Sequence, residues 1–233
     1  MIYSRLKILK PNAGQAMLKT AALIPAAGSG SRLGKGPKAF LKLKEKTILE
    51  TVITSFEGTV DEIILAVSAD MYAKAKTYEK SNVKLIIGAE TRQATVFKLI
   101  NHSDADIVLI HDAARPFLKK QLIQESINTA LARKAVVVTK PLFDSILNRK
   151  TQQSPNRDDY VAIQTPQTFN RELILDAHKN ALIHSITASD DATLVRVLGH
   201  EVATIEGSSW LDKITSLDDY QRAIALAEVW DDS

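Results

Sequence analysis

Short aliphatic and β-branched runs recur along the chain, separated by polar segments whose apolar residues fall three or four positions apart. The runs are typical of buried parallel strands, and the segments between them of amphipathic helices. Strands are predicted at residues 21–24, 63–67, 83–87, 107–110, 135–138 and 201–206. The alternation predicts an α/β fold in which helices cover both faces of a mostly parallel sheet.

The three- and four-residue spacing predicts helices at residues 47–56, 69–80, 91–100, 119–132, 170–183 and 189–198. A last helix is expected after Thr215, because Thr215 and Asp218 fit a capping box, and it should run to about Trp230. The pattern breaks at residues 144–163, where a polar, proline-containing stretch is too long for a tight turn. We expect one domain over residues 20–233, with this stretch projecting from it as an arm.

The composition is that of a globular protein large enough to bury its own core, with 233 residues and 45% hydrophobic content. No apolar run reaches the roughly 18 residues of a membrane span, so we expect no membrane partner. The chain has no cysteine, which excludes disulfides, thiolate catalysis and cysteine-bound zinc. This composition fits a reducing compartment, and we expect the protein to be cytoplasmic.

The net charge of +3 comes from the first 19 residues, which hold four cationic residues and no acidic one. We interpret residues 1–19 as a flexible basic extension, with Met17 as a candidate natural start and a basic arm with its own role as the alternative. It lacks the apolar core and cleavage site of a signal peptide. The rest has no basic stripe with interleaved aromatic residues, so we expect no nucleic-acid partner.

A glycine-rich turn, AAGSGSRLG at residues 26–34, follows the first predicted strand. Backbone N–H groups in such a turn can converge on an anion such as phosphate, although a simple strand-to-loop turn is the alternative. Leu33 occupies the third small-residue position of a dinucleotide fingerprint, and no lysine with a following serine or threonine completes a P-loop. Arg32 and Lys38 flank the bend at Pro37, so they either cradle a triphosphate or are two solvated surface charges.

Asp112 comes directly after the predicted strand at 107–110, at the carboxyl end where open α/β sheets bind their ligands. A carboxylate there suits Mg²⁺, which commonly takes one or two protein carboxylates together with substrate phosphates. Capping of a turn is the alternative role. His111 is expected to pack or form hydrogen bonds, because no second histidine stands at metal-binding spacing.

Several motifs together resemble a known family. Residues 24–33 (IPAAGSGSRL) and 37–41 (PKAFL) are similar to the nucleotide-binding signature of sugar-phosphate nucleotidyltransferases. Residues 111–116 (HDAARP) and 165–169 (TPQTF) narrow the resemblance to the 2-C-methyl-D-erythritol 4-phosphate cytidylyltransferases of the non-mevalonate isoprenoid pathway. The resemblance runs from about residue 21 to 227 and implies a Rossmann-like nucleotidyltransferase sheet with a protruding dimerisation arm. One departure is that Arg32 and Pro37 stand one residue closer than in many members.

The resemblance implies CMP transfer from CTP to 2-C-methyl-D-erythritol 4-phosphate by attack of the substrate phosphate on the α-phosphorus, with release of pyrophosphate. It implies Mg²⁺ or another divalent cation held by Asp112, and a homodimer in which Arg157 enters the partner's site. The catalytic residues implied are Arg32, Lys38, Arg157 and Lys213. The residues implied to bind CTP are Pro25, Ala26, Ala27, Gly28, Gly30, Arg32, Lys38, Ala89, Glu90, Arg92, Thr95, Asp112 and Ala113. Those implied to bind the polyol phosphate are Ser145, Arg157, Thr165, Ser189, Asp190 and Lys213.

Other roles stay open for some of these residues. The segment around Glu90 is also an ordinary strand-to-helix turn, and Asp190 also fits a capping box with Thr187. Lys213 could be a surface lysine, and the arm could be disordered. A ribitol 5-phosphate or other polyol phosphate cytidylyltransferase, and a non-catalytic nucleotide-binding module, are the alternative functions.

Overall fold

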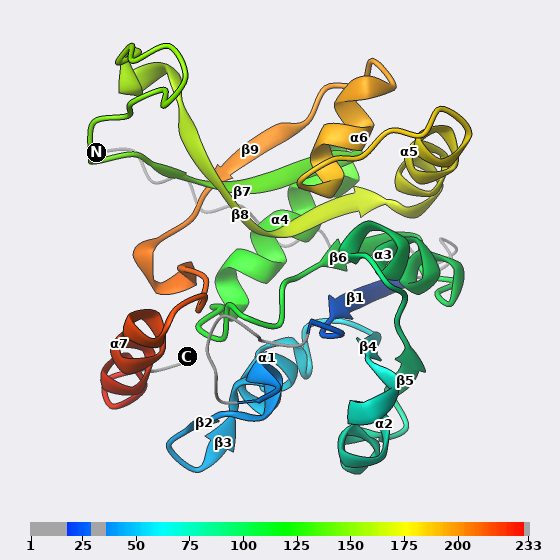
Figure 1. The fold of residues 1–233 in the computed structure, drawn as a ribbon. Helices are drawn as coiled ribbons and strands as arrows, with labels where there is room; N and C mark the ends of the chain where they lie inside the picture. Colours follow the sequence, from blue (N-terminus) through cyan, green and yellow to red (C-terminus); the bar gives the residue numbers. More distant parts are fainter. Residues whose placement is uncertain (1–17, 29–35, 231–233) are drawn as a thin grey trace, which may run out of the picture.

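The computed structural model describes residues 18–28 and 36–230, and its described part is built on one seven-stranded sheet (Figure 1). The strand order is β5-β4-β1-β6-β8-β7-β9. Every neighbouring pair is parallel except the two that involve β8, which runs against both β6 and β7. The strands are β1 (Thr20–Pro25), β4 (Glu62–Val67), β5 (Val83–Ile87), β6 (Ile107–Ile110), β7 (Ala135–Pro141), β8 (Val161–Asn170) and β9 (Ala203–Glu206). Residues 1–17 of the expected basic extension lie outside the described residues.

Helices cover both faces of the sheet, as the alternation of strands and helices predicts. One face packs against α1 (Ile48–Phe56), α2 (Ala69–Ala75) and α4 (Lys120–Arg133). The other packs against α3 (Arg92–Asn101), α5 (Arg171–Ile183) and α6 (Asp191–Val197). The last helix, α7 (Leu217–Ala227), lies near the hairpin of β2 (Lys42–Leu43) and β3 (Lys46–Thr47), and a third apolar cluster joins them. None of the described helices is long and apolar enough to span a bilayer.

The sequence pattern missed β8, the strand at the centre of the sheet's second half. Its buried residues include Gln164, Thr165, Gln167 and Thr168, so it has no aliphatic run to mark it. These polar side chains are hydrogen-bonded to neighbouring elements, as burial of polar groups requires. The segment 142–160 between β7 and β8 projects beyond the sheet as the end of a long hairpin (Figure 1).

Side-chain caps set the ends of several helices. Thr47 and Glu50 form a capping box at α1, so this helix begins one residue later than predicted. The box predicted at Thr215 and Asp218 is wrong, because Ser216 and Asp219 form the capping box of α7. Since the predicted pair lies one position earlier than the observed pair, spacing alone did not distinguish them.

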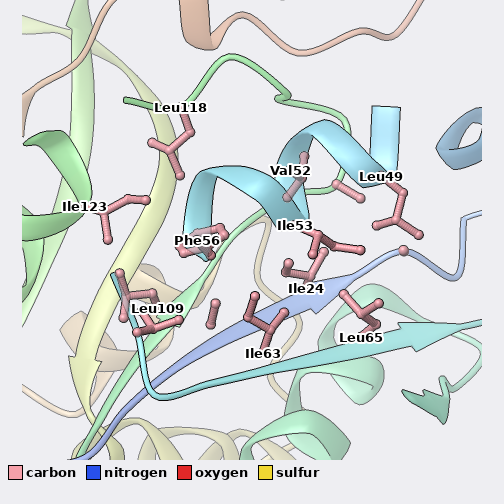
Figure 2. Close-up of a cluster of buried hydrophobic side chains, with 14 of the residues drawn as sticks. Ile24, Leu49, Val52, Ile53, Phe56, Ile63, Leu65, Leu109, Leu118 and Ile123 are labelled. Carbon is pink, nitrogen blue, oxygen red and sulfur yellow. The ribbon is translucent and has the colours of Figure 1, made fainter. Parts of the chain in front are cut away.

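The apolar face of α1 lies across β1 and β4 (Figure 2). Leu49, Val52 and Phe56 are fully buried there against Ile24 and Ile63. This packing holds the carboxyl end of β1, which Ala26, Ala27 and Gly28 follow.

We predict that Phe56→Ala lowers the free energy of unfolding by about 3–5 kcal/mol, because it removes a fully buried ring and leaves a cavity. Urea denaturation measures this change. Leu131→Ala, at an exposed position of α4, is the control and should change stability little. Equal effects of the two substitutions would contradict the assigned packing.

Candidate active site

A cavity of about 360 Å³ opens at the carboxyl ends of the parallel strands. The chain runs from β1 to β4 on one side and later from β5 to β6 on the other, so the strand order reverses beside β1. Open α/β sheets bind ligands at such a reversal. The walls follow β1, β5 and β6 and a segment before α7, and they comprise Pro25, Ala26, Ala27, Gly28, Lys38, Ala39, Ala89, Glu90, Thr91, Arg92, Thr95, Asp112, Ala113, Ala114, Lys213 and Thr215.

The structure brings together every described residue that the resemblance implied for CTP, and it adds Lys213. Gly30 and Arg32 lie outside the described residues, so the structure tests neither of them nor the shortened spacing from Arg32 to Pro37.

Two loops of the cavity wall approach each other closely at Gly88. A Cβ atom at this position would lie 2.8 Å from the Cβ of Ala27, which explains a glycine here. The Thr95 hydroxyl accepts a hydrogen bond from the Ala89 N–H at 2.9 Å and lies 3.1 Å from the Ala89 carbonyl oxygen. Thr91 caps α3. These contacts fix the backbone of residues 88–91 beside Ala27.

The carboxylate of Asp112 is surrounded by three cationic side chains. Lys213 Nζ lies 2.6 Å from one oxygen and Arg92 Nε 3.1 Å from the other, while Arg115 Nε is 3.9 Å away. Burial raises the pKa of Asp112, but Arg92, Lys213 and Arg115 outweigh it and hold this pKa well below its usual range. The carboxylate is therefore ionised at neutral pH.

Lys38 and Lys213 reach the same wall of the cavity from opposite ends of the chain. Lys38 Nζ donates to the Ile214 carbonyl at 2.6 Å. The Ile214 N–H donates to the Ala114 carbonyl at 2.9 Å, and the Ile214 side chain is buried. The Arg115 guanidinium donates to the Leu211 carbonyl at 2.6 Å. The loop after β6 thus holds the segment that carries Lys213.

Thr165 does not line the cavity, although the resemblance implied a role in substrate binding. It is buried, and its hydroxyl accepts a hydrogen bond from the Asp112 N–H at 3.1 Å. His111 Nε2 lies 2.9 Å from the Arg115 carbonyl and must donate to it, so Nδ1 is left to accept from Thr165 at 3.1 Å. Burial lowers the pKa of His111 to about 4, which makes the ring neutral at pH 7. Thr165 and His111 therefore fix the backbone that presents Asp112.

Lys213, which was also implied for the polyol phosphate, lines the cavity, whereas the remaining residues of that set lie outside its walls. Ser145 and Arg157 are exposed in the segment 142–160, where the Arg157 guanidinium donates to the Phe143 carbonyl. Asp190 is the N-cap of α6 and accepts the Thr193 N–H at 3.0 Å, and Ser189 contacts it at 3.2 Å. The capping box expected of Thr187 and Asp190 is wrong, because Asp190 is itself the N-cap of the helix, so its structural role is present in a different form.

Two charged residues near the site were missed. Arg115 belongs to the recognised HDAARP motif, yet only the fold shows that it contacts Asp112. Asp191 directly follows Ser189 and Asp190, which the resemblance implied for the polyol phosphate. Its carboxylate lies 2.8 Å from Arg92 Nη1. Arg92 and Asp191 stand 99 positions apart, so no spacing in the sequence predicts their contact. The signal that could have indicated Asp191 was its position in the first turn of a helix.

The carboxylate content of the site limits how it can hold a metal. No group of three or more His, Cys, Asp or Glu side chains suited to a metal occurs within residues 18–28 and 36–230. Asp112 presents one carboxylate to the cavity, and Glu90 lines the same cavity. This donor set fits Mg²⁺, which is commonly held by one or two carboxylates with phosphates and water as the other ligands.

Comparisons with known proteins agree with this geometry. A profile of the 2-C-methyl-D-erythritol 4-phosphate cytidylyltransferase family matches residues 20–229. A relative of that name from Deinococcus radiodurans is 40% identical over 211 residues, covering 89% of each chain. Another, from Thermus thermophilus, is 36% identical over 216 residues, covering 91% of this chain and 99% of its own.

Solved structures give the same result for the fold. The crystal structure of the cytidylyltransferase of that name from Thermus thermophilus has a TM-score of 0.80 at 32% identity, covering 91% of this chain and all of its own. The 4-diphosphocytidyl-2C-methyl-D-erythritol synthase of Anaerococcus prevotii has a TM-score of 0.82 at 27% identity, covering 91% and 96%. The fold and the matches define the class, a nucleotidyltransferase of the α/β type. The chain belongs to the 2-C-methyl-D-erythritol 4-phosphate cytidylyltransferase family.

We predict that Asp112→Asn destabilises the protein at pH 7, because three cations lose their shared counterion. The low folded pKa means that the stability from the wild-type carboxylate is present above its unfolded pKa of about 3.9 and is lost as pH falls toward the folded pKa. The difference in unfolding free energy between the two proteins should therefore shrink below about pH 4. Urea denaturation between pH 7 and 3 measures it, and a difference that is constant with pH would contradict the prediction.

Proposed function

We propose that the protein transfers CMP from CTP to 2-C-methyl-D-erythritol 4-phosphate, giving 4-diphosphocytidyl-2-C-methyl-D-erythritol and pyrophosphate. The observation that carries the proposal is the cavity at the strand-order reversal, which Lys38 lines together with Lys213 and Arg92, the two cations that contact Asp112 there. Such a group of cations suits a ligand with several phosphate charges. Its position in a member of this family selects CTP as that ligand.

In the proposed reaction an oxygen of the substrate phosphate attacks the α-phosphorus of CTP in line. A new P–O bond forms, the bond to the bridging α–β oxygen breaks, and pyrophosphate leaves with that oxygen. A phosphate monoester has a second pKa near 6, so it is already a dianion at neutral pH and needs no general base. Positioning and stabilisation of phosphoryl charge then supply the catalysis.

The residues of the cavity have three kinds of role in this proposal. Lys38 and Lys213 neutralise charge on the reacting phosphates, together with Arg32 from the loop outside the described residues. The small side chains of Ala26, Ala27, Gly28, Ala89 and Ala113 allow the nucleotide to lie close to the backbone, and Pro25, Glu90, Arg92 and Thr95 complete the walls. Gly30 belongs to the same loop as Arg32.

Asp112 would hold Mg²⁺ or another divalent cation, with the CTP phosphates as further ligands. The ion would supply positive charge to the phosphates when it is bound. Lys213 and Arg92 already contact the Asp112 carboxylate. The ion would therefore share this carboxylate with two cationic side chains instead of being enclosed by several carboxylates.

We also propose a homodimer in which the segment 142–160 carries Ser145 and Arg157 into the partner's site. Support comes from exposed large apolar side chains on and beside this segment, namely Phe143, Leu147, Tyr160, Val161 and Ile163. Phe143 is 73% exposed in the single chain, and a second copy would cover it. Ser189 and Asp190 would border the polyol phosphate from the chain's own side, while the buried Thr165 would act on this site through the Asp112 backbone. Location in the cytoplasm stays a prediction from the composition.

Pyrophosphate release in the presence of CTP and Mg²⁺ tests the reaction. We expect turnover with 2-C-methyl-D-erythritol 4-phosphate, little with ribitol 5-phosphate, and little when ATP, GTP or UTP replaces CTP. Lys213→Ala should lower kcat by about 10²- to 10³-fold, the effect of removing one electrostatic stabiliser of a transition state. Preference for ribitol 5-phosphate would assign a different polyol, and no turnover with any pair would contradict an enzymatic function.

Mixing inactive subunits tests the shared site. Arg157→Ala and Lys213→Ala subunits are each expected to be inactive, but a heterodimer of the two would contain one intact site. It should show about half the wild-type rate per dimer. Wild type mixed with the double variant Arg157→Ala/Lys213→Ala is the control, since neither site of that heterodimer has both residues. Purified heterodimers without activity would contradict the exchange of Arg157.

A further inference from the structure

A second set of charged groups contacts Arg92 through a different nitrogen from the one that faces Asp112. Arg92 Nη1 lies 2.8 Å from one oxygen of Asp191, and His178 Nε2 lies 3.1 Å from the other. The Asp191 and His178 side chains are each 1% exposed. They come from α6 and α5, which cover the face of the sheet that also carries α3.

Arg92 needs this support because of its place in the fold. It is the first residue of α3, where the helix dipole disfavours a positive charge. Burial also lowers its pKa, but the carboxylates of Asp191 and Asp112 outweigh burial and raise the pKa above its usual value. Arg92 donates to Asp112 through Nε and to Asp191 through Nη1. The residue also lines the cavity. The two carboxylates therefore fix both the charge and the orientation of the guanidinium.

Asp191 is itself held in place from several directions. Its backbone N–H donates to the Gln167 side-chain oxygen at 3.0 Å, and the same oxygen accepts the Ala192 N–H at 2.9 Å. The pKa of Asp191 is raised by burial but lowered more by His178 and Arg92, so the carboxylate is ionised. An ionised carboxylate only accepts hydrogen bonds, which means that His178 Nε2 carries a proton and donates. The His178 ring stacks on Phe97 of α3 with 5.9 Å between centroids.

We propose that Asp191 and His178 are positioning residues of this enzyme, which act through Arg92 by holding its guanidinium at the wall of the nucleotide cavity. The inference rests on the proposed function, because it assumes that the cavity binds CTP. His178 of α5, Asp191 of α6 and Arg92 of α3 then connect the helices on this face of the sheet to the cavity. Neither residue touches the cavity, so neither is a catalytic residue.

A double-mutant cycle on Arg92 and Asp191 tests whether one acts through the other. Asp191→Asn keeps the shape but removes the charge, and we expect kcat/KM for CTP to fall by about 10- to 100-fold, the range known for residues that orient a ligand group. In an Arg92→Ala background the same substitution should have no further effect. Asp176→Asn, at an exposed site on α5, is the matched control and should leave kcat/KM unchanged. A wild-type value for Asp191→Asn, or effects that multiply in the double variant, would overturn the proposal.

If Asp191→Asn does not fold, a pair of variants at His178 tests the same proposal. His178→Gln keeps an N–H donor near Asp191, whereas His178→Leu keeps only the bulk. We expect His178→Gln to retain more of kcat/KM than His178→Leu while both have similar melting temperatures. Equal kcat/KM values would overturn the role of His178.

Calorimetric titration with CTP separates this inference from the proposed reaction. A wild-type protein that binds CTP without transferring CMP would contradict the proposed reaction but not this inference. The double-mutant cycle would then compare values of Kd for CTP. A wild-type protein that does not bind CTP would overturn both.

Discussion

The ion cluster centred on Asp112 joins parts of the chain that have no local connection. Its carboxylate follows β6, Arg92 opens α3, and Lys213 precedes α7, so three separate elements meet at one negative charge. Without that charge, Arg92, Lys213 and Arg115 would repel one another in a partly buried space. The cluster therefore sets the geometry of the cavity wall, and the surrounding hydrogen bonds serve to keep Asp112 in its place.

The antiparallel strand β8 provides much of this support. Thr165 accepts the Asp112 N–H, and Gln167 accepts two N–H groups at the start of α6, which carries Asp191. A strand of aliphatic residues would pack equally well between β6 and β7 but could not hold these groups. The polar character of β8 at Thr165 and Gln167 is thus explained by their hydrogen bonds to the backbone of the two acidic residues that contact Arg92.

The sequence predicted the layers of the fold and most elements because buried parallel strands and amphipathic helices differ in the spacing of their apolar residues. The same rule failed at β8, where polar residues are buried and held by specific partners. For the site, the motifs around Gly28, Glu90 and Asp112 indicated residues that now line one cavity. Asp191 was missed because its partner Arg92 stands 99 residues away, and such a contact exists only after α3 and α6 have packed on the sheet.

Whether the sequence predicted a site residue depends on how that residue acts. Residues that meet a ligand through a short loop lie in compact motifs, since the backbone that binds phosphate or a base is a few residues long. Residues that orient those groups are supplied by whatever element packs next to them, and their identity depends on tertiary contacts. Thr165 shows the difference within one motif: the family resemblance implied a substrate contact, whereas in the structure its hydroxyl joins His111 to the Asp112 backbone. A motif therefore locates a functional region, and the hydrogen bonds of the folded chain determine which of its side chains can reach the ligand.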